Sequence, residues 1–539
     1  MSDKYNRPSE PAPAYGTYPN QNQQGFNGDG PPPSSQEGNQ YQFRQDQYYN
    51  LNAEGDGAPI GTFEEKFPVE GEGNKPKWND WPFIIFFLAC VLAFIALAVI
   101  TLRAWANHYH ARGTGVYGGS NTGTLNTNSA IMLVVSCMIA LVFSFLGFVL
   151  ARMFPRFFII AGIILNIISG LATAVMYLSL KYYSAGIVFI VFTVMCAFCF
   201  WGMRSRIPFS VCVLTTVMDV MKQFPQTWIV TLLGSIVGSA FSVLFSAVIV
   251  ATYMKYDNKT NNPGCNTSGG SCSNSKLIGI LVVVFFCGYY IAEVIRNVIH
   301  CTVSGIFGTW YYFSKSDQGM PRFPAFGALK RALTYSFGSI CFGSLIVAII
   351  ETAKAVLRLL VDGVAGGGAD SGWVQCIALL ANFIFSFLEW LTRYFNHYAY
   401  VFIALYGKPY LRAAKETWHM IREKGIDALI NDNLINVALG FYTFFTCYIT
   451  ALFAYLYLRY TKPDYNHDNA YTPALMAFAF IIAMEISNIA TETIRSGTAT
   501  FFVALGNDPE VFHLSYPERF DEIFRSYPDV LKKLSHQNV

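Results

Sequence analysis

The segment "PFIIFFLACVLAFIALAVITLRA" (residues 82–104) decides the fold class, because Arg103 is its only charged residue. A helix that crosses the hydrocarbon core of a bilayer needs about 20 predominantly apolar residues. Segments of this kind recur along the chain at residues 82–104, 129–151, 157–179, 184–203, 227–253, 277–299, 332–357, 373–396, 436–460 and 473–497. The sequence therefore predicts an all-α polytopic membrane protein with about ten transmembrane helices.

The composition of the whole chain supports this fold class. Hydrophobic residues make up 53% of the 539 residues and charged residues only 13%, against about 25% charged in soluble proteins. The formal net charge is +3, and no concentrated basic patch occurs. The sequence does not indicate a nucleic-acid partner, whereas the lipid bilayer is an expected one.

Residues 1–79 differ sharply from the rest, being rich in Pro, Gly, Gln, Asn and Ser. Such a composition cannot bury a core, so we expect a disordered tail. Residues 1–30 lack the apolar region of a cleaved signal peptide, which favours a cytosolic N-terminus. We therefore expect a disordered cytosolic tail over 1–79, a transmembrane domain over 80–500 and a cytosolic C-terminal segment over 501–539.

Ten crossings from a cytosolic N-terminus place both termini in the cytosol. The expected inner loops hold fourteen Lys and Arg residues and the outer loops six, as the positive-inside rule requires. The outer loop 254–276 holds the only two N-glycosylation sequons, at Asn258 and Asn266. It also holds Cys265 and Cys272, for which we expect a disulfide, with two free thiols as the alternative.

Two sequence features bear on how the helices are arranged. The sixth and eighth segments continue through residues 300–313 and 397–406, so they must tilt, break or project into the cytosol. The amphipathic stretch 209–224 suits the inner interface. "GSIVG" (234–238) is a GxxxG pattern and predicts close helix packing.

No enzyme motif is present: the sequence has no Walker A loop, HExxH, GxSxG or zinc-like Cys/His grouping. We therefore expect no catalytic residue, no cofactor and no metal.

Ionisable residues inside the apolar segments carry the functional signal. Each costs ~2.5–3.5 kcal/mol in lipid on insertion scales, so each should face protein or water. Four segments of the second half carry such residues at helical spacing, which places them on one helix face. They are Glu293, Arg296, Asn297 and His300; Glu351, Lys354 and Arg358; Glu389, Arg393, Asn396 and His397; and Glu485, Asn488, Glu492 and Arg495. We predict that these four stripes line one polar path or gate.

The depth of the carboxylates separates their roles. Glu485 lies near the midplane and has no basic neighbour on its own helix, so with Asn488 it is the candidate site for a cation or proton. Glu293 and Glu389 should lie closer to the cytosol and Glu351 closer to the outer side. The alternative for Glu389 and for Glu492 is mutual neutralisation with the arginine one turn further on, Arg393 and Arg495 respectively.

Aromatic residues stand beside acidic ones in "CGYYIAEVIR" (287–296) and "LEWLTRYFNHYAY" (388–400). Aromatic faces hold quaternary ammonium groups well, which makes candidate walls of Tyr289, Tyr290, Trp390 and Tyr394. The alternative is an interfacial belt or ordinary packing.

Four segments together resemble the choline transporter-like family of solute carriers, in particular its fungal plasma-membrane members. They are "TVSGIFGTWYYF" (302–313), "GSICFGSLI" (338–346), "YFNHYAYVFIALYGKPYLRAAKETWHMI" (394–421) and "ETIRSGTATFFVALGNDPE" (492–510). The resemblance spans roughly residues 80–510. The loop 105–128 departs from animal members, because it holds no cysteine and no sequon.

The resemblance implies a plasma-membrane transporter with ten helices and both termini in the cytosol. It implies transport of choline, ethanolamine or a related small organic cation, possible proton exchange, and no enzymatic activity. The alternatives are a channel or lipid-handling protein that uses the same stripes, and a non-transporting sensor or scaffold that works through the tail and the inner loop 407–435.

Overall fold

The structure is a computed structural model that describes residues 78–110, 127–179, 181, 183–256, 275–315, 320–321, 323–365, 372–423, 430, 433–462, 472–525, 527 and 530–531. Within these ranges the regular secondary structure is helical and no strand occurs. This confirms the all-α fold class.

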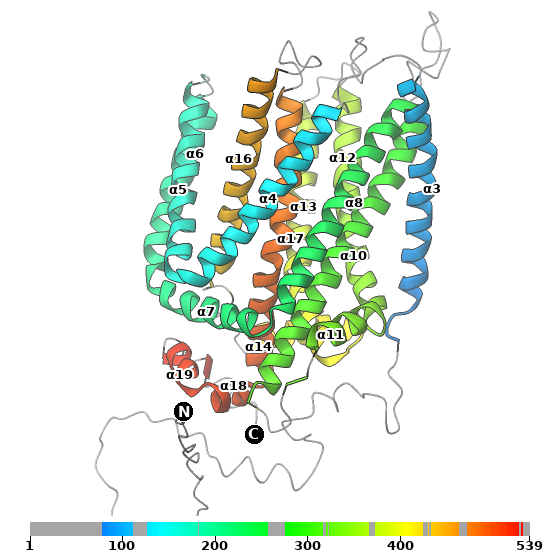
Figure 1. The fold of residues 1–539 in the computed structure, drawn as a ribbon. Helices are drawn as coiled ribbons and strands as arrows, with labels where there is room; N and C mark the ends of the chain where they lie inside the picture. The colour runs from blue at the N-terminus through cyan, green and yellow to red at the C-terminus, as the bar shows by residue number, and fades with distance from the viewer. Residues whose placement is uncertain are drawn as a thin grey trace, which may run out of the picture. The chain divides into compact units, whose positions relative to one another are not determined.

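Ten long helices coincide with the ten predicted segments (Figure 1). They are α3 (Pro82–His110), α4 (Thr127–Met153), α5 (Pro155–Ser179), α6 (Tyr183–Met203), α8 (Gln226–Tyr256), α10 (Ser275–Phe313), α12 (Phe337–Ala365), α13 (Gly372–Tyr406), α16 (Ile435–Thr461) and α17 (Thr472–Asn507). Among the described residues, eight helices are long and apolar enough to cross a membrane, and nine if the bent pair of α6 and α7 counts as one span. The protein is therefore a multi-pass membrane protein.

The two extended segments are continuous helices. Helix α10 has 39 residues and α13 has 35, which correspond to roughly 58 Å and 52 Å at 1.5 Å per residue. Both exceed the ~30 Å hydrocarbon core. Both helices therefore extend beyond it, and residues 300–313 and 397–406 continue them without a break.

Helices α10 and α17 form the centre of the bundle. Helix α10 contacts α3, α8, α12, α13 and α17, while α17 also contacts α4 and α16. In the apolar window of α17, 56% of the residues are buried, against 17% in α3. The peripheral helix α3 thus leaves most of its side chains for lipid, whereas more than half of the α17 window is enclosed by protein.

Short helices gather at one end of the bundle (Figure 1). They are α7 (Ile207–Gln223), α11 (Pro324–Leu333), α14 (Tyr410–Glu423), α18 (Pro509–Ser515) and α19 (Pro517–Arg525). The sequence predicts that this end faces the cytosol. Helix α7 contains the predicted amphipathic stretch, meets α6 at 50° and packs its buried face against α5, α17 and α19.

The GxxxG pattern of α8 produces close packing against both central helices. A Cβ atom at Gly234 would lie 2.5 Å from Ile299 of α10, and one at Gly238 would lie 2.3 Å from Ile489 of α17. Both distances are below any ordinary contact, so a larger residue at either position would require the facing isoleucine side chain to move. The prediction for this motif is confirmed.

Candidate functional site

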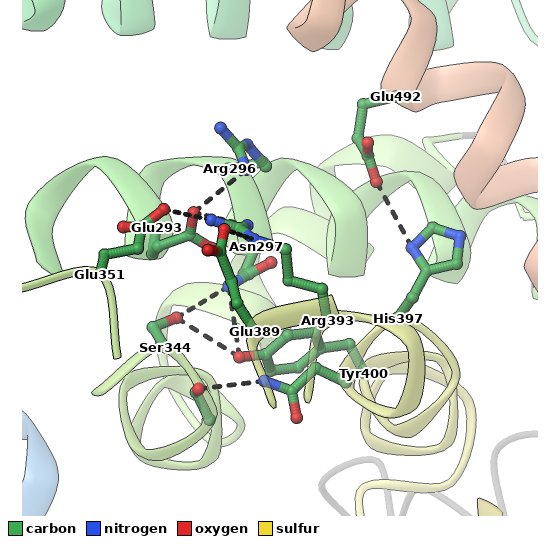
Figure 2. Close-up of polar contacts among 12 residues, drawn as sticks. Glu293, Arg296, Asn297, Ser344, Glu351, Glu389, Arg393, His397, Tyr400 and Glu492 are labelled. Atoms are coloured by element: carbon green, nitrogen blue, oxygen red, sulfur yellow. Dashed lines mark hydrogen bonds and ion pairs between the residues drawn. The ribbon is translucent and has the colours of Figure 1, made fainter. Parts of the chain in front are cut away.

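Arg393 of α13 is the centre of a charge cluster that joins three helices (Figure 2). Its Nη1 donates to Oε1 of Glu293 on α10 over 2.9 Å. Its Nη2 donates to Oε1 of Glu351 on α12. Its Nε donates to Oε1 of Glu389, one turn earlier on α13, over 3.0 Å. One planar guanidinium can serve three carboxylates because its N–H groups point in different directions.

Two further cations complete this cluster. Arg296 Nη1 lies 3.0 Å from Glu293 Oε1, and Lys354 Nζ lies 2.6 Å from Glu389 Oε2. Three carboxylates therefore face three cations, and the six formal charges cancel. The local pairing of Glu389 with Arg393 is confirmed, although Arg393 also binds two carboxylates from other helices.

The separate depths expected for the carboxylates are wrong in one respect. Glu351, expected nearer the outer side, binds the same guanidinium as Glu293 and Glu389. Depth counted along each sequence segment failed because the helices differ in length and extend beyond the core by different amounts. Figure 2 shows the three carboxylates converging on Arg393.

A second cluster lies where α17 meets α10 and α13. Oε1 of Glu492 lies 3.4 Å from Nδ1 of His300 and 3.6 Å from Nδ1 of His397. The two imidazole rings stack with their centroids 4.5 Å apart. Within the described part of the chain, Glu492 thus contacts two histidines. The expected close ion pair with Arg495 does not form, because the helix turns the carboxylate toward α10 and α13.

Neutral hydrogen bonds extend this junction to α12. Asn297 Nδ2 donates to Ser344 Oγ over 2.9 Å and to the Tyr400 hydroxyl oxygen over 3.2 Å. Asn396 Nδ2 donates to the carbonyl oxygen of Gly343 over 3.1 Å. Each of these side chains is buried or half-buried, so the bonds replace water that the helix interior excludes.

Tyr410, at the start of α14, also binds this junction. Its hydroxyl donates to Asn396 Oδ1 over 2.5 Å. Burial raises the pKa of Tyr410 to about 12, although the hydrogen bond with Asn396 lowers it. The phenol is therefore protonated at neutral pH and acts as the donor.

The two residues proposed for the centre of the path lie on α17 outside the Arg393 cluster. Glu485 is half-buried, and within the described residues no Lys, Arg or His nitrogen lies within 4.0 Å of it. It is close enough to interact electrostatically with Arg296. Asn488, one turn further on, is also half-buried, and its carbonyl oxygen accepts a hydrogen bond from Thr491.

The four predicted aromatic walls occupy different surroundings. Tyr289 lies close enough to Glu351 and Glu389 to interact with them electrostatically. Tyr290 is fully buried, and its hydroxyl donates to the Cys341 carbonyl oxygen over 3.2 Å. Trp390 is 60% exposed and stacks on Tyr394 with ring centroids 5.9 Å apart. Of the four, Tyr289 is the side chain whose electrostatic surroundings include carboxylates of the charge cluster.

The predicted glycosylation sites Asn258 and Asn266 and the predicted disulfide of Cys265 and Cys272 lie outside the described residues. The small pockets among the described residues include these two. One is lined by residues of α7, α10 and α17, including Val217, Trp310 and Phe501. The other involves Cys301, Gly305 and Arg331. None of the residues proposed above for substrate binding lines either pocket.

Sequence reasoning missed His300 as a partner of His397, and also missed Ser344 and Tyr410. Helical spacing places Tyr400 on the same face as Asn396 and His397, but did not identify it as a site residue. Tyr400 and Tyr410 stand in the family-like segment 394–421, which was the available signal. Ser344 resembles many other small residues of apolar helices. Its role depends on a neighbour 47 positions away in the sequence, Asn297.

Fold and site together define a helical multi-pass membrane protein with an ion-paired polar interior. The family described as plasma-membrane choline transporter matches residues 187–510. Protein PNS1 of Kluyveromyces lactis is 78% identical over the full length of both chains, and Protein PNS1 of Saccharomyces cerevisiae is 64% identical over the full length of both. Protein PNS1 of Eremothecium gossypii is 66% identical over 92% of this chain and 90% of its own.

The chain belongs to the choline transporter-like family. It is accordingly a membrane transporter of a small-molecule substrate, and its family is one of transporters.

Proposed function

We propose that this transporter moves choline, ethanolamine or a related small organic cation across the plasma membrane, with both termini in the cytosol. The observation that carries the proposal concerns the contacts of Glu485. It is a carboxylate of a central helix that forms no ion pair among the described residues, whereas Glu293, Glu351 and Glu389 are all paired.

The charge balance favours Glu485 over the Arg393 cluster as the cation site. Three carboxylates and three cations leave that cluster neutral, so it offers no net attraction to a cationic substrate. An unpaired carboxylate in a low-dielectric surrounding attracts a cation much more strongly. Asn488, one turn along the same helix face, adds an amide that can bind a hydroxyl or amine.

The Arg393 cluster suits the role of a gate. A carrier must close its path on one side at a time, and Arg393 ties α10, α12 and α13 together with directional bonds. Separation of these helices would release Arg393 from carboxylates on two neighbouring helices at once. Tyr289 borders the cluster and can contribute an aromatic face to a passing ammonium group.

Proton coupling follows from the same carboxylate. Glu485 can hold a proton or an organic cation, but one charge cannot neutralise both. Binding of one therefore favours release of the other, which is the competition that exchange requires.

Uptake into proteoliposomes that contain the purified full-length protein tests this proposal. Labelled choline and ethanolamine are offered with and without an imposed pH gradient, and saturation and counterflow are measured. Glu485→Gln should abolish most of the saturable uptake with unchanged protein incorporation. Glu518→Gln, which alters an exposed carboxylate of α19, is the matched control and should transport like the unaltered protein.

The outcomes separate the alternatives. Unaltered transport in Glu485→Gln across external pH would contradict the assignment of the cation site. Flux that does not saturate and shows no counterflow would indicate a channel. A scaffold that acts through its tail would give no flux in vesicles, whereas deletion of residues 1–70 should leave the flux of a carrier intact.

A further inference from the structure

Three side chains from three helices converge at the junction of α10, α13 and α17. One coordinating atom from each of His300, His397 and Glu492 lies within 4.8 Å of the other two. His300 is 1% exposed at its side chain and Glu492 11%, while His397 is 23% exposed. Figure 2 shows the Glu492 carboxylate directed from α17 toward the ring of His397.

The hydrogen bonds of His300 fix which of its nitrogens can bind a cation. Nε2 lies 2.8 Å from the carbonyl oxygen of His397. A carbonyl oxygen can only accept, so Nε2 must carry the proton, and in the neutral ring Nδ1 then presents a lone pair. That lone pair lies 3.4 Å from Oε1 of Glu492. A cation placed between this nitrogen and the carboxylate oxygen would bind both, in place of the Ser496 hydroxyl that lies 2.6 Å from the same nitrogen.

An imidazole whose second nitrogen donates to a backbone carbonyl is the usual arrangement of a metal-ligating histidine. This outer hydrogen bond sets the tautomer and the ring orientation. In His300 the acceptor is the backbone of His397 itself. The backbone of one proposed ligand therefore orients the ring of the other.

The two separations between Glu492 and the histidines match tetrahedral zinc coordination. With Zn–N and Zn–O bonds of roughly 2.0–2.2 Å and tetrahedral angles, neighbouring ligand atoms stand about 3.3–3.5 Å apart. The observed separations of Glu492 Oε1 from the two Nδ1 atoms are 3.4 Å and 3.6 Å. Two histidines and one carboxylate form one of the known three-ligand zinc sets, in which water or another ligand occupies the fourth position.

Two neighbouring side chains weaken the binding of a cation at this site. Ser496 Oγ lies 2.6 Å from His300 Nδ1 and competes for its lone pair. Its hydroxyl can instead turn to the carbonyl oxygen four residues earlier, as Thr498 and Thr500 do on the same helix. Arg495 interacts electrostatically with Glu492, and its charge weakens binding of a divalent ion. We therefore expect micromolar and not nanomolar affinity.

We propose that His300, His397 and Glu492 form a binding site for a divalent transition-metal ion, Zn²⁺ in the first place, that bridges α10, α13 and α17. The site does not depend on the proposed substrate. The sequence could not reveal it, because the ligands lie on separate helices and no local Cys/His spacing connects them. Zn²⁺ bound there ties the two central helices to the Arg393-bearing helix and stabilises this packing of the bundle.

Metal binding by the purified full-length protein without a polyhistidine tag tests the site. Zn²⁺ is measured by equilibrium dialysis, and Co²⁺ by its visible absorption, which is intense in tetrahedral and weak in octahedral coordination. We expect one ion per chain at neutral pH and a tetrahedral Co²⁺ spectrum. His397→Gln and Glu492→Gln should each weaken Zn²⁺ binding by more than about 10-fold. Loss of a residue that only hydrogen-bonds to a metal ligand already weakens binding by about this factor.

Matched variants keep the test decisive. His419→Gln, on α14, removes a histidine outside the site and should bind Zn²⁺ like the unaltered protein. Ser496→Ala removes the competing hydroxyl and should bind at least as tightly. His397 is the most exposed of the three ligands, so its replacement is the least disruptive to folding. Three results would each overturn the proposal. An intense thiolate-to-Co²⁺ charge-transfer band would show that cysteines bind the metal instead. The other two are no bound Zn²⁺ at micromolar concentrations, and equal affinity in His397→Gln and the unaltered protein.

Discussion

Replacement of Arg393 by glutamine should destabilise the protein mainly by leaving one carboxylate without a partner. Glu293 retains Arg296 and Glu389 retains Lys354. Glu351 loses Arg393, its only ion-pair partner among the described residues. Removal of one member of a buried pair costs about 3–5 kcal/mol.

We take the lower end of this range. The side chains of Arg393 and Glu351 are 30% and 20% exposed, so water partly solvates the stranded carboxylate. The expected loss in the free energy of unfolding is therefore about 3 kcal/mol for Arg393→Gln. Glu351→Gln leaves Arg393 with two carboxylates and should cost about 1 kcal/mol.

A double-mutant cycle measures the interaction itself. The free energy of unfolding is determined by SDS titration in mixed micelles for both single variants and for the double variant. The double variant no longer contains the stranded carboxylate, so its loss should fall short of the sum by about 2 kcal/mol. The exposed pair of Arg519 and Asp219 is the control, and its cycle should give less than about 1 kcal/mol.

Additive losses for Arg393 and Glu351, or a coupling no larger than that of the exposed pair, would refute the reasoning. Either result would mean that the two groups do not depend on each other for stability. Arg393→Lys provides a further distinction, because it preserves the charge but not the fork of donors. It should recover only part of the loss.

Two further predictions concern packing at the end of the bundle where α14 lies. A Cβ at Gly343 would lie 2.5 Å from the Tyr400 hydroxyl and from the Tyr410 ring, so Gly343→Ala should cost about 1–3 kcal/mol in unfolding free energy. The control Gly440→Ala, whose Cβ meets nothing within 4 Å, should cost nothing. Equal effects of the two substitutions would contradict the close packing at Gly343. The Asp80 carboxylate accepts hydrogen bonds from the backbone nitrogen of Tyr410 over 2.9 Å and from a serine hydroxyl of α12 over 2.6 Å. Asp80→Ala should therefore lower the free energy of unfolding by about 2 kcal/mol and speed proteolysis at residues 407–409. Unchanged stability and cleavage would show that this contact does not hold α14.

Hydropathy predicted the helical bundle well because every membrane-spanning helix needs about 20 predominantly apolar residues. Residues 82–104 and 473–497 both meet this requirement, and both are helices. Hydropathy does not reveal which helix is central. Helix α17 differs from α3 in its buried fraction, and that difference depends on neighbours distant in the sequence.

The sequence predicted which residues belong to the candidate site, but not which of them contact each other. Helical spacing identified Glu293, Glu351, Glu389 and Arg393 because each is costly in lipid. Spacing along one helix suggests only partners on that helix, and it therefore paired Glu492 with Arg495. The direction of a side chain across a helix interface depends on helix rotation, which no single segment encodes.

The segment that carries the family resemblance, residues 394–421, acquires a physical explanation from these contacts. Asn396 reaches the backbone of α12, His397 reaches Glu492 of α17, and Tyr400 reaches Asn297 of α10. One face of α13 therefore binds three helices within little more than one turn, and Arg393 adds carboxylates one turn earlier.

Such a junction differs from an apolar interface in how it responds to movement. Apolar contacts weaken gradually as helices slide, whereas directional bonds to fixed partners break over a fraction of an ångström. Contacts that share one helix face must also break together, because α13 cannot rotate away from α12 without displacing Tyr400 from α10. The polar face of α13 thus favours two discrete arrangements of the bundle over a continuum. A gate requires such two-state behaviour, and substitution of Asn396 or Tyr400 should therefore alter transport and stability together.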